Sequence, residues 1–311
     1  MTVRLAVTLG DPRGIGPEIV EQALRAGLDA EIVLVGAEDQ MSGLPAAERV
    51  SVGTWGLGSG DSSDHARTLR AGRIAGHAIE AAAKLAVAGS VDAIVTAPAN
   101  KSALHLAGFP WPGHTEWLAH LAGDVPVAMM LASERLRVVL VTTHVPLRDV
   151  PTLLTTEGVV TTGRITIAGL RSWFGVAEPR LAVCALNPHA GEGGAFGDED
   201  GRILAPAARQ LGAAGPLPAD TVFVRALRGE FDAVLAPYHD VGMTAIKVAS
   251  FGEAVNVTLG LPFPRTSPDH GTAFDIAGTG QANPSSMRRA LEMAVKLGQR
   301  STVDGQRPTV D

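Results

Sequence analysis

The sequence is poor in cysteine and in aromatic residues. Of its 311 residues only Cys184 is a cysteine, and aromatic residues make up 4%. A single cysteine excludes an internal disulfide and a paired-cysteine metal site, so the chain fits a reducing compartment and we expect it to be cytoplasmic. Cys184 lies in the apolar run LAVCAL and is expected in the core. The N-terminal MTVRLAVTLG leads into a predicted strand rather than a signal peptide.

Long apolar runs and basic clusters are also missing. No run approaches the roughly 18 to 20 apolar residues that span a membrane. Lys and Arg number 26 against 32 Asp and Glu, which gives a net charge of -6. Nucleic-acid phosphates are neutralised by clustered Lys and Arg, which do not occur here. The sequence therefore indicates neither a membrane nor a nucleic acid as partner, while it leaves room for a basic pocket that binds a small anion.

What is present is an alternation of short apolar runs with longer helical patterns. Apolar strands of this kind are buried on both faces, which is typical of a mostly parallel sheet covered by helices, so we predict an α/β fold. The clearest helix is expected from Asp64 to Ala88, after the cap-rich DSSD and before Gly89, and another begins near Asn283. The predicted strands lie within residues 4–9, 31–36, 91–98, 125–132, 136–143, 180–188, 232–238 and 254–261.

Three histidines follow predicted strands in polar loops. They are His144 in TTHVPL, His189 in NPHAGEGG and His239 in PYHDVG. Neutral imidazole is a common ligand of catalytic divalent metals, and three such ligands leave coordination positions open for water or substrate. A single loop histidine is more often structural, but three in equivalent positions predict a metal centre.

Several loops after strands carry groups suited to an anion. GDPRGIGPE at 10–18 is a glycine-rich turn, although it matches neither the dinucleotide GxGxxG nor the phosphate-binding P-loop pattern. His114 and Thr115 stand at an expected helix start, with Thr115 as candidate cap. Phosphate binding requires several donors, and the candidate cations are Lys101, Lys247 and Arg265.

Two further polar residues are candidates for catalysis together with Lys247. Asp220 opens a helical run in ADTVF, where it serves as a helix cap, as a partner of a metal-bound histidine or as an additional ligand, in that order of preference. His270, in an expected helix start at 269–272, is assigned to cofactor or substrate rather than to metal. The remaining histidines in helical patterns are interpreted as structural or exposed: His65, His77, His105 and His120.

These motifs occur together in an order that resembles one family over nearly the whole chain. The chain is similar to the 4-hydroxythreonine-4-phosphate dehydrogenase (PdxA) family of NAD-dependent enzymes in vitamin B6 synthesis. The matching segments are GDPRGIGPE (10–18), the run from 98 to 116 that ends in GHTE, THVPL (143–147), NPHAGE (187–192), YHD (238–240) and LGLPFPRTSPDHGTAFDIAG (259–278).

The resemblance implies two α/β/α subdomains flanking a cleft, as in isocitrate and isopropylmalate dehydrogenases, with subdomains near 1–125 plus 271–311 and 126–270. It also implies a homodimer, with the active site in the cleft near the subunit interface. NAD is the expected cofactor, with NADP as the alternative, and no residue is assigned to it. The divalent ion, zinc, magnesium, manganese or cobalt, corresponds to His144, His189 and His239, and substrate-binding positions correspond to His114, Thr115, Lys247, Asn256 and Arg265.

One departure from the family pattern concerns specificity. Val241 stands where the family usually has glutamine, so a polar contact to the substrate is lost. The expected reaction is oxidation and decarboxylation of 4-phosphohydroxy-L-threonine, and the alternative substrate is a related four-carbon hydroxy acid phosphate. A metal-dependent phosphatase is the remaining alternative, but Asp220 alone provides too few carboxylates for a two-metal site. A non-catalytic sugar-phosphate binding protein has no need for three metal-binding histidines.

Overall fold

The structure is a computed structural model that describes residues 2–56, 63–250 and 253–303. Its contacts divide the chain into two units: unit 1 runs to Val125 and resumes at Leu261, and unit 2 is Pro126–Gly260. The chain returns to unit 1 at Leu261, earlier than the boundary at 271 expected from the sequence. The end of that expected range, residues 304–311, lies outside the described residues.

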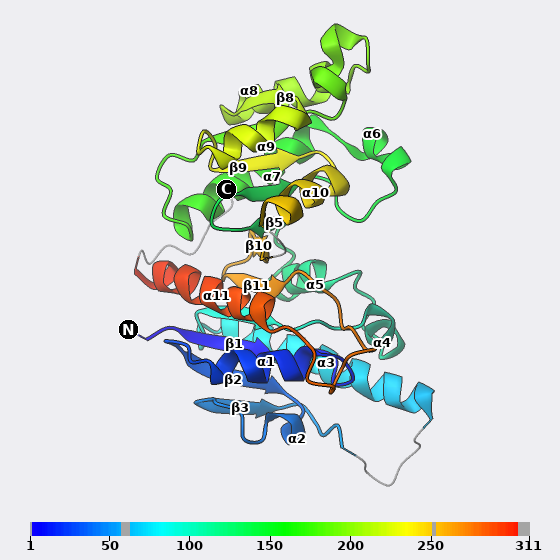
Figure 1. Cartoon of the computed structure of the whole chain (residues 1–311), viewed down its shortest axis with the longest axis vertical. Coiled ribbons are helices and arrows are strands. Elements are labelled where there is room, and N and C mark those ends of the chain that lie inside the picture. The colour runs from blue at the N-terminus through cyan, green and yellow to red at the C-terminus, as the bar shows by residue number, and fades with distance from the viewer. Residues whose placement is uncertain (1, 57–62, 251–252, 304–311) are drawn as a thin grey trace. The chain divides into compact units, whose positions relative to one another are not determined.

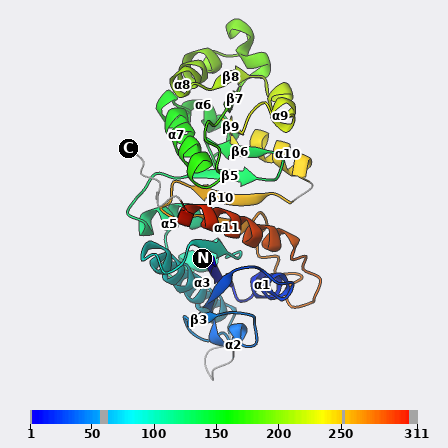
Figure 2. The same ribbon diagram turned by 90° about the vertical axis from the view of Figure 1, so that its left-hand side faces the viewer.

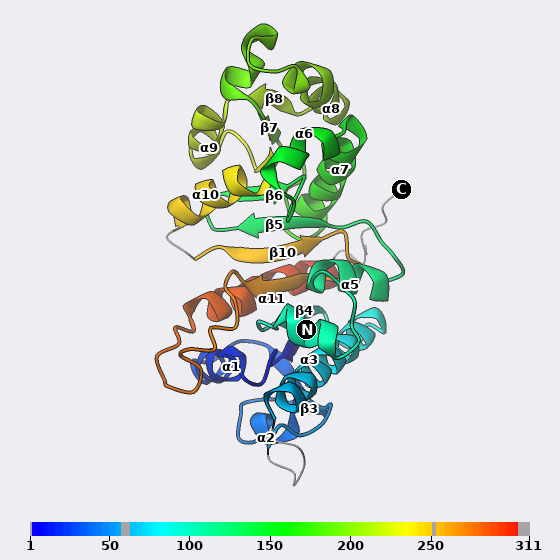
Figure 3. The same ribbon diagram turned by 90° about the vertical axis from the view of Figure 1, so that its right-hand side faces the viewer.

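Unit 1 is a parallel sheet with helices on both faces. Its strand order is β3-β2-β1-β4-β11, and every pair is parallel. Helices α1 and α11 cover one face, and α3, with α4 and α5 against it, covers the other (Figures 1 and 3). The strands are β1 (Arg4–Thr8), β2 (Glu31–Gly36), β3 (Glu48–Ser51), β4 (Ala93–Thr96) and β11 (Arg265–Pro268). The helices are α1 (Gly16–Arg25), α2 (Glu38–Met41), α3 (Asp64–Val87), α4 (Lys101–Leu106), α5 (His114–Leu121) and α11 (Ser285–Val303).

Helix α3 organises one face of unit 1. The Ser63 side chain accepts a hydrogen bond from the Ala66 amide and so caps the helix, as the DSSD pattern predicts. A side chain at Gly72 would place its Cβ 1.9 Å from the carbonyl oxygen of Ala103, so the absence of a side chain allows α4 to pack closely against α3. The loops after β4, which contain candidate site residues, are thereby held against this helix.

Unit 2 has a mixed sheet of order β10-β5-β6-β9-β7-β8. Strand β5 is antiparallel to both of its neighbours, and the remaining pairs are parallel. Helices α7 and α8 lie on one face and α9 and α10 on the other (Figure 2). The strands are β5 (Ala128–Ala132), β6 (Arg137–Leu140), β7 (Leu181–Cys184), β8 (Ala214–Leu217), β9 (Ala233–Ala236) and β10 (Val255–Leu259). The helices are η1 (Leu147–Asp149), α6 (Val150–Leu153), α7 (Thr156–Ser172), η2 (Pro188–Gly194), η3 (Asp200–Leu204), α8 (Ala205–Leu211), α9 (Ala219–Leu227) and α10 (His239–Ser250).

The eight strands expected from apolar runs are present, and so are the helices expected at 64–88 and near 283. The sequence missed β3, β8 and β11, which have the polar or broken sequences ERVS, AGPL and RTSP. The helix start expected at 269–272 is wrong. Glycine-containing turns follow His270, and α11 begins only at Ser285, after Pro284.

Buried side chains of the unit 2 sheet include Cys184, as expected. Burial, together with the charge of Asp200, raises the pKa of its thiol to about 12. Among the described residues, no helix combines the length and apolar character needed to cross a membrane.

Candidate functional site

Three neighbouring parallel strands of unit 2 carry the three histidine loops. Strands β6, β9 and β7 lie side by side in that order, and they lead into His144, His239 and His189 respectively. The carboxyl ends of parallel strands share one edge of a sheet, which is where α/β proteins bind ligands. The topology therefore brings all three loops to the same edge.

His144 and His239 are brought together. Their ring centroids are 5.6 Å apart, and they line a cavity of about 120 Å³ together with Thr143, Tyr238 and Asp240, among others. His239 begins α10, and its Nδ1 lies 2.7 Å from Oδ1 of Asp240. A carboxylate at Nδ1 favours the tautomer that leaves Nε2 available to a metal.

His189 lies exposed on the turn after β7 and does not join this pair. Its Nδ1 is 3.1 Å from Oε2 of Glu192, the same imidazole–carboxylate arrangement as at His239. Within the described residues, no three His, Cys, Asp or Glu side chains are close enough together to hold a metal. The donor chemistry of His144 and His239 fits a divalent cation, whereas the complete three-histidine ligand set stays a prediction.

Asp220 does not cap a helix, contrary to the interpretation ranked first from the sequence. Helix α9 begins at Ala219 with Pro218 in the cap position, so Asp220 is an exposed residue of the first helical turn. The carboxylate is favourable there because the free amides of a helix start carry partial positive charge. Its role as a partner of the metal site stays a prediction.

Lys247 and Asn256 complete the predicted residues of unit 2. Lys247 is an exposed residue of α10. Asn256 lies on β10 opposite Leu131 of β5, and its Nδ2 donates to Sδ of Met129 at 3.5 Å. Its Oδ1 is buried and has no hydrogen-bond partner within the described structure. Because a buried polar atom without a partner costs free energy, Asn256 offers an acceptor that a ligand can satisfy.

Arg265 is a buried cation of unit 1. Strand β11 pairs with β4, and this places the guanidinium against Thr96 at the end of β4. Its Nε and Nη2 donate to Oγ1 of Thr96 at 3.1 and 2.6 Å. Burial lowers the pKa of Arg265 to about 10, while Glu116 opposes that shift, so the group stays charged at neutral pH. A buried guanidinium of this kind is suited to binding a phosphate or carboxylate.

The positive charge of Arg265 also acts on His114. Burial, followed by the charges of Arg265 and Lys101, lowers the pKa of His114 to about 3. Its Nε2 is buried and has no hydrogen-bond partner in the part of the chain that is described. The ring is therefore neutral at physiological pH, with a nitrogen left for a ligand. Arg265 and Lys101 both act electrostatically on His114, and we call these three residues of unit 1 the anion-binding set, because their charges and the open nitrogen are suited to an anion.

Thr115 is not the helix cap that the sequence predicts. Helix α5 begins at His114, and Gly113 occupies the cap position without a capping side chain. Thr115 thus lies in the first turn beside His114. Thr96 and Glu116, which surround Arg265, were not predicted. The signal for Thr96 is a hydroxyl at the end of the otherwise apolar run AIVT.

Acidification is expected to destabilise the protein through His114. The unfolded chain binds a proton near pH 6.5 and the folded protein only near pH 3, so the contribution of this group to stability falls as pH drops below 6.5. Between pH 7 and pH 4.5 we expect a loss of about 2 kcal/mol from this group. Urea unfolding at both pH values should show a loss smaller by about that amount in His114→Gln. Equal losses in both proteins would contradict a neutral buried His114.

The glycine-rich loop at 10–18 packs against the segment that follows β11. The Ile15 amide donates to the carbonyl oxygen of Thr272 at 2.9 Å. Asp11 is buried and pairs with Arg13 at 2.8 Å, and the Arg13 guanidinium lies 5.0 Å from the ring centroid of Phe274. Arg13 and Phe274 also line a hollow of about 300 Å³ with Asp64 and Arg67. Arg13 of the loop therefore borders a hollow with charged side chains, and the loop leads on into α1 at Gly16.

His270 is exposed after β11, and its Nδ1 lies 3.1 Å from the carbonyl oxygen of Gly271. Within the described residues, no side chain forms a hydrogen bond with His270. Its assignment to cofactor or substrate stays a prediction.

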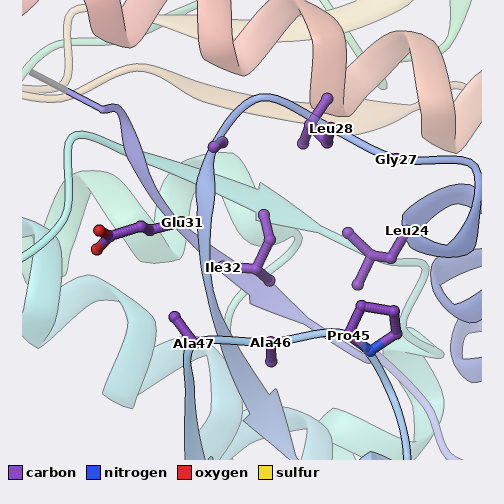
Figure 4. Close-up of a pocket in the computed structure, with 9 residues that line it drawn as sticks. Leu24, Gly27, Leu28, Glu31, Ile32, Pro45, Ala46 and Ala47 are labelled. Atoms are coloured by element: carbon purple, nitrogen blue, oxygen red, sulfur yellow. The ribbon is translucent and has the colours of Figure 1, made fainter.

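A second hollow of unit 1 has a different character. It measures about 310 Å³ and lies between the end of α1, the start of β2 and residues 45–47. Figure 4 shows mainly apolar side chains around it, with the carboxylate of Glu31 directed away from Leu24 and Pro45. It lies at the amino end of β2, whereas sites in such folds lie at the carboxyl ends of strands. This hollow is not part of the candidate site.

Comparisons with known proteins show the family of this chain. The family described as pyridoxal phosphate biosynthetic protein PdxA matches residues 18–294. A 4-hydroxythreonine-4-phosphate dehydrogenase of Geobacter metallireducens is 46% identical, with 94% of this chain and 95% of that protein covered. A D-threonate 4-phosphate dehydrogenase of Salmonella typhimurium is 42% identical, with 95% and 99% covered.

Solved structures of similar proteins have the same fold. The crystal structure of a 4-hydroxythreonine-4-phosphate dehydrogenase from Klebsiella pneumoniae has a TM-score of 0.85 at 40% identity, covering 96% of this chain and 99% of that one. A β-decarboxylating dehydrogenase from Thermococcus kodakarensis, at 16% identity and a TM-score of 0.50, is similar in fold alone, with 98% of this chain and 88% of that one covered. The predicted fold class is thereby confirmed. The chain belongs to the PdxA family.

Proposed function

We propose that this protein is an NAD-dependent dehydrogenase that oxidises and decarboxylates 4-phosphohydroxy-L-threonine in pyridoxal phosphate biosynthesis. The observation that carries the proposal is the anion-binding set of unit 1. A buried guanidinium, Arg265, and a neutral histidine with an unpartnered nitrogen, His114, suit the phosphate of such a substrate. The proposal includes a homodimer located in the cytoplasm.

Each group of residues has a proposed task. Arg265, His114 and Thr115 hold the phosphate, and Asn256 accepts a hydrogen bond from the substrate. Lys247 binds substrate and transfers a proton, whereas His270 and Asp220 are proposed to assist near the cofactor and the metal ligands. His144, His239 and His189 hold the divalent cation, and Asp240 keeps His239 in the tautomer with a free Nε2.

The two bound groups supply chemistry that side chains cannot. When bound, zinc, magnesium, manganese or cobalt polarises a substrate oxygen, and NAD, or alternatively NADP, accepts a hydride. The residues around them orient the substrate so that the bond to be broken faces the acceptor. A two-metal phosphatase would need several carboxylates near the histidines. Asp220 is exposed, and within the described residues no cluster of carboxylates accompanies it, so the phosphatase alternative is not favoured.

The direct test is an absorbance assay for NADH. Purified protein is incubated with NAD, a divalent cation and 4-phosphohydroxy-L-threonine, and the same mixture without the cation serves as control. Cation-dependent formation of NADH, with release of carbon dioxide in equal amount, supports the proposal. Release of inorganic phosphate without NADH would contradict it.

The name of one relative supports a second candidate substrate for this protein. The Salmonella protein at 42% identity is named a D-threonate 4-phosphate dehydrogenase, and such a substrate carries a hydroxyl where 4-phosphohydroxythreonine carries an amino group. Val241, next to Asp240 on α10, offers no hydrogen bond, and its side chain packs against the apolar core of unit 2. We therefore propose a four-carbon hydroxy acid phosphate as the alternative substrate.

The substitution Val241→Gln is expected to raise the preference for the amino acid over the hydroxy acid. A site without a polar partner distinguishes weakly between the two, whereas an added amide improves discrimination by about tenfold. The measurement is the ratio of kcat/KM for 4-phosphohydroxy-L-threonine and D-threonate 4-phosphate in both proteins. Val241→Leu, which keeps an apolar side chain, is the control. A strong preference of the parent for the amino acid that the substitution leaves unaltered would show that Val241 does not set specificity.

A further inference from the structure

The turn that carries His189 has an unusual backbone. His189, Ala190, Gly191, Glu192 and Gly193 all have positive φ, from 41° to 79°. Left-handed backbone is disfavoured for residues with a side chain, because Cβ approaches the following carbonyl oxygen. Three of these five residues have a side chain, so the segment needs external contacts to persist.

One buried carboxylate, that of Asp200 at the start of η3, holds the backbone that leads into this segment. Its Oδ1 accepts a hydrogen bond from the Leu186 amide at 2.9 Å. Its Oδ2 accepts from the Asn187 amide at 3.1 Å and from Asn187 Nδ2 at 2.9 Å. Asp200 is 1% exposed, so its carboxylate is satisfied by these donors rather than by water. The two residues that lead into the left-handed turn are therefore fixed by a single side chain.

The surrounding residues fit this anchor closely. Asn187 Nδ2 also donates to Oε2 of Glu199 at 2.8 Å. A Cβ at Gly191 would lie 2.9 Å from the carbonyl oxygen of Gly197 and 3.6 Å from Oδ2 of Asp200, so the turn lies directly against the anchor. The far side of the turn, with His189 and Glu192, is exposed. Hydrogen bonds to Asp200 and Glu199 thus hold one side of the turn, whereas the side chain of His189 on the other side is exposed.

We propose that Asp200 is a positioning residue, which holds the left-handed turn so that His189 is presented at the sheet edge shared with His144 and His239. The assignment of His189 to a metal rests on the proposed function, whereas the anchoring of the turn does not. The effect of Asp200 on metal binding passes through the backbone of Leu186 and Asn187. Without it, His189, Ala190 and Glu192 lose the support for their positive φ.

The substitution Asp200→Asn tests the proposal with little change in volume. One oxygen becomes an NH₂ group, so a donor replaces an acceptor of the Leu186 or Asn187 amide. Asp198→Asn is the matched control, because Asp198 is exposed nearby and its carboxylate pairs with Arg202 on the surface. Both proteins are compared with the parent at full length.

Two measurements separate anchoring from metal binding. Hydrogen exchange at the amides of Leu186 and Asn187 is expected to be about tenfold faster or more in Asp200→Asn. The dissociation constant for Co²⁺, titrated by its absorption bands, is expected to rise about 10- to 100-fold. Asp198→Asn should match the parent in both. Exchange rates and a Co²⁺ constant unchanged in Asp200→Asn would overturn the proposal.

A second substitution shows whether the effect passes through the left-handed backbone. Glycine adopts positive φ without strain, so adding Ala190→Gly to Asp200→Asn is expected to recover part of the Co²⁺ affinity, by about threefold or more. No recovery would show that Asp200 does not act through the turn. If Asp200→Asn does not fold, Asn187→Ala, which removes only the side-chain donor, takes its place with the same two measurements. A parent that binds no Co²⁺ would contradict the proposed metal site, whereas the exchange rates would still decide whether Asp200 anchors the turn.

Discussion

His239→Ala is expected to lose bound divalent metal and to reduce turnover by about a thousandfold or more. His239 lies beside His144 with a ring-centroid separation of 5.6 Å, and its Nδ1 is held by Asp240. Removing the imidazole removes a proposed metal ligand together with the carboxylate contact that orients it. Metal content of the purified protein and the rate of NADH formation are the two measurements.

A histidine with the same local geometry provides the control for this substitution. The Nδ1 of His120 lies 2.7 Å from Oδ1 of Asp124, the same distance as between His239 and Asp240. His120, however, is an exposed residue of α5. His120→Ala should retain metal content and turnover. Full metal occupancy and full rate in His239→Ala would show that the metal, if bound, is held elsewhere.

Arg265→Ala is expected to lower kcat/KM for the phosphorylated substrate by about 10- to 100-fold, mainly through KM. The side chain is a buried cation, and a charge-assisted hydrogen bond to phosphate contributes about 1.5 to 3 kcal/mol. Arg265→Lys should lower kcat/KM by a smaller factor, because it keeps the positive charge. Some loss is still expected, since lysine cannot form the bidentate hydrogen bonds of a guanidinium. Steady-state kinetics with varied substrate, and separately with varied NAD, measure the effect.

The control for Arg265 is a surface arginine. Arg225 pairs with Glu230 at 2.8 Å on the exterior of unit 2, so Arg225→Ala should leave both Michaelis constants unchanged. Circular dichroism of each variant shows whether the fold persists. An unchanged KM for the substrate in Arg265→Ala, with a large rise in KM for NAD, would assign Arg265 to the cofactor instead.

The sequence correctly predicted those strands and helices that are specified by a pattern of neighbouring residues. Apolar runs such as 31–36 and 232–238 became buried strands, and Ser63 caps the long helix. Strand β11 was missed because RTSP carries no apolar pattern, and its place in the sheet depends on pairing with β4. The caps expected at Thr115 and Asp220 were wrong, since Gly113 and Pro218 occupy those positions. Capping depends on backbone angles that residue type specifies only weakly.

For the candidate site, the sequence predicted residues but not their surroundings. Parallel strands are expected to bring their following loops to one edge, and His144 and His239 do meet there. The sequence contained no signal for the low pKa of His114 or for the carboxylate of Asp200 beneath the His189 turn. Both depend on burial among segments distant in sequence, which local patterns do not specify.

The discontinuity of unit 1 has a consequence for the order of folding during synthesis. Among the described residues, unit 2 is one continuous stretch within Pro126–Gly260, whereas unit 1 also requires β11 and α11. When the ribosome has released residue 260, every strand of unit 2 is available to pair. At that moment β4 still lacks its neighbour β11, and α11 has not yet covered β1 and β4. The segment synthesised after unit 2 thus completes the sheet of unit 1, and it brings Arg265 to His114 and Lys101 in the same step.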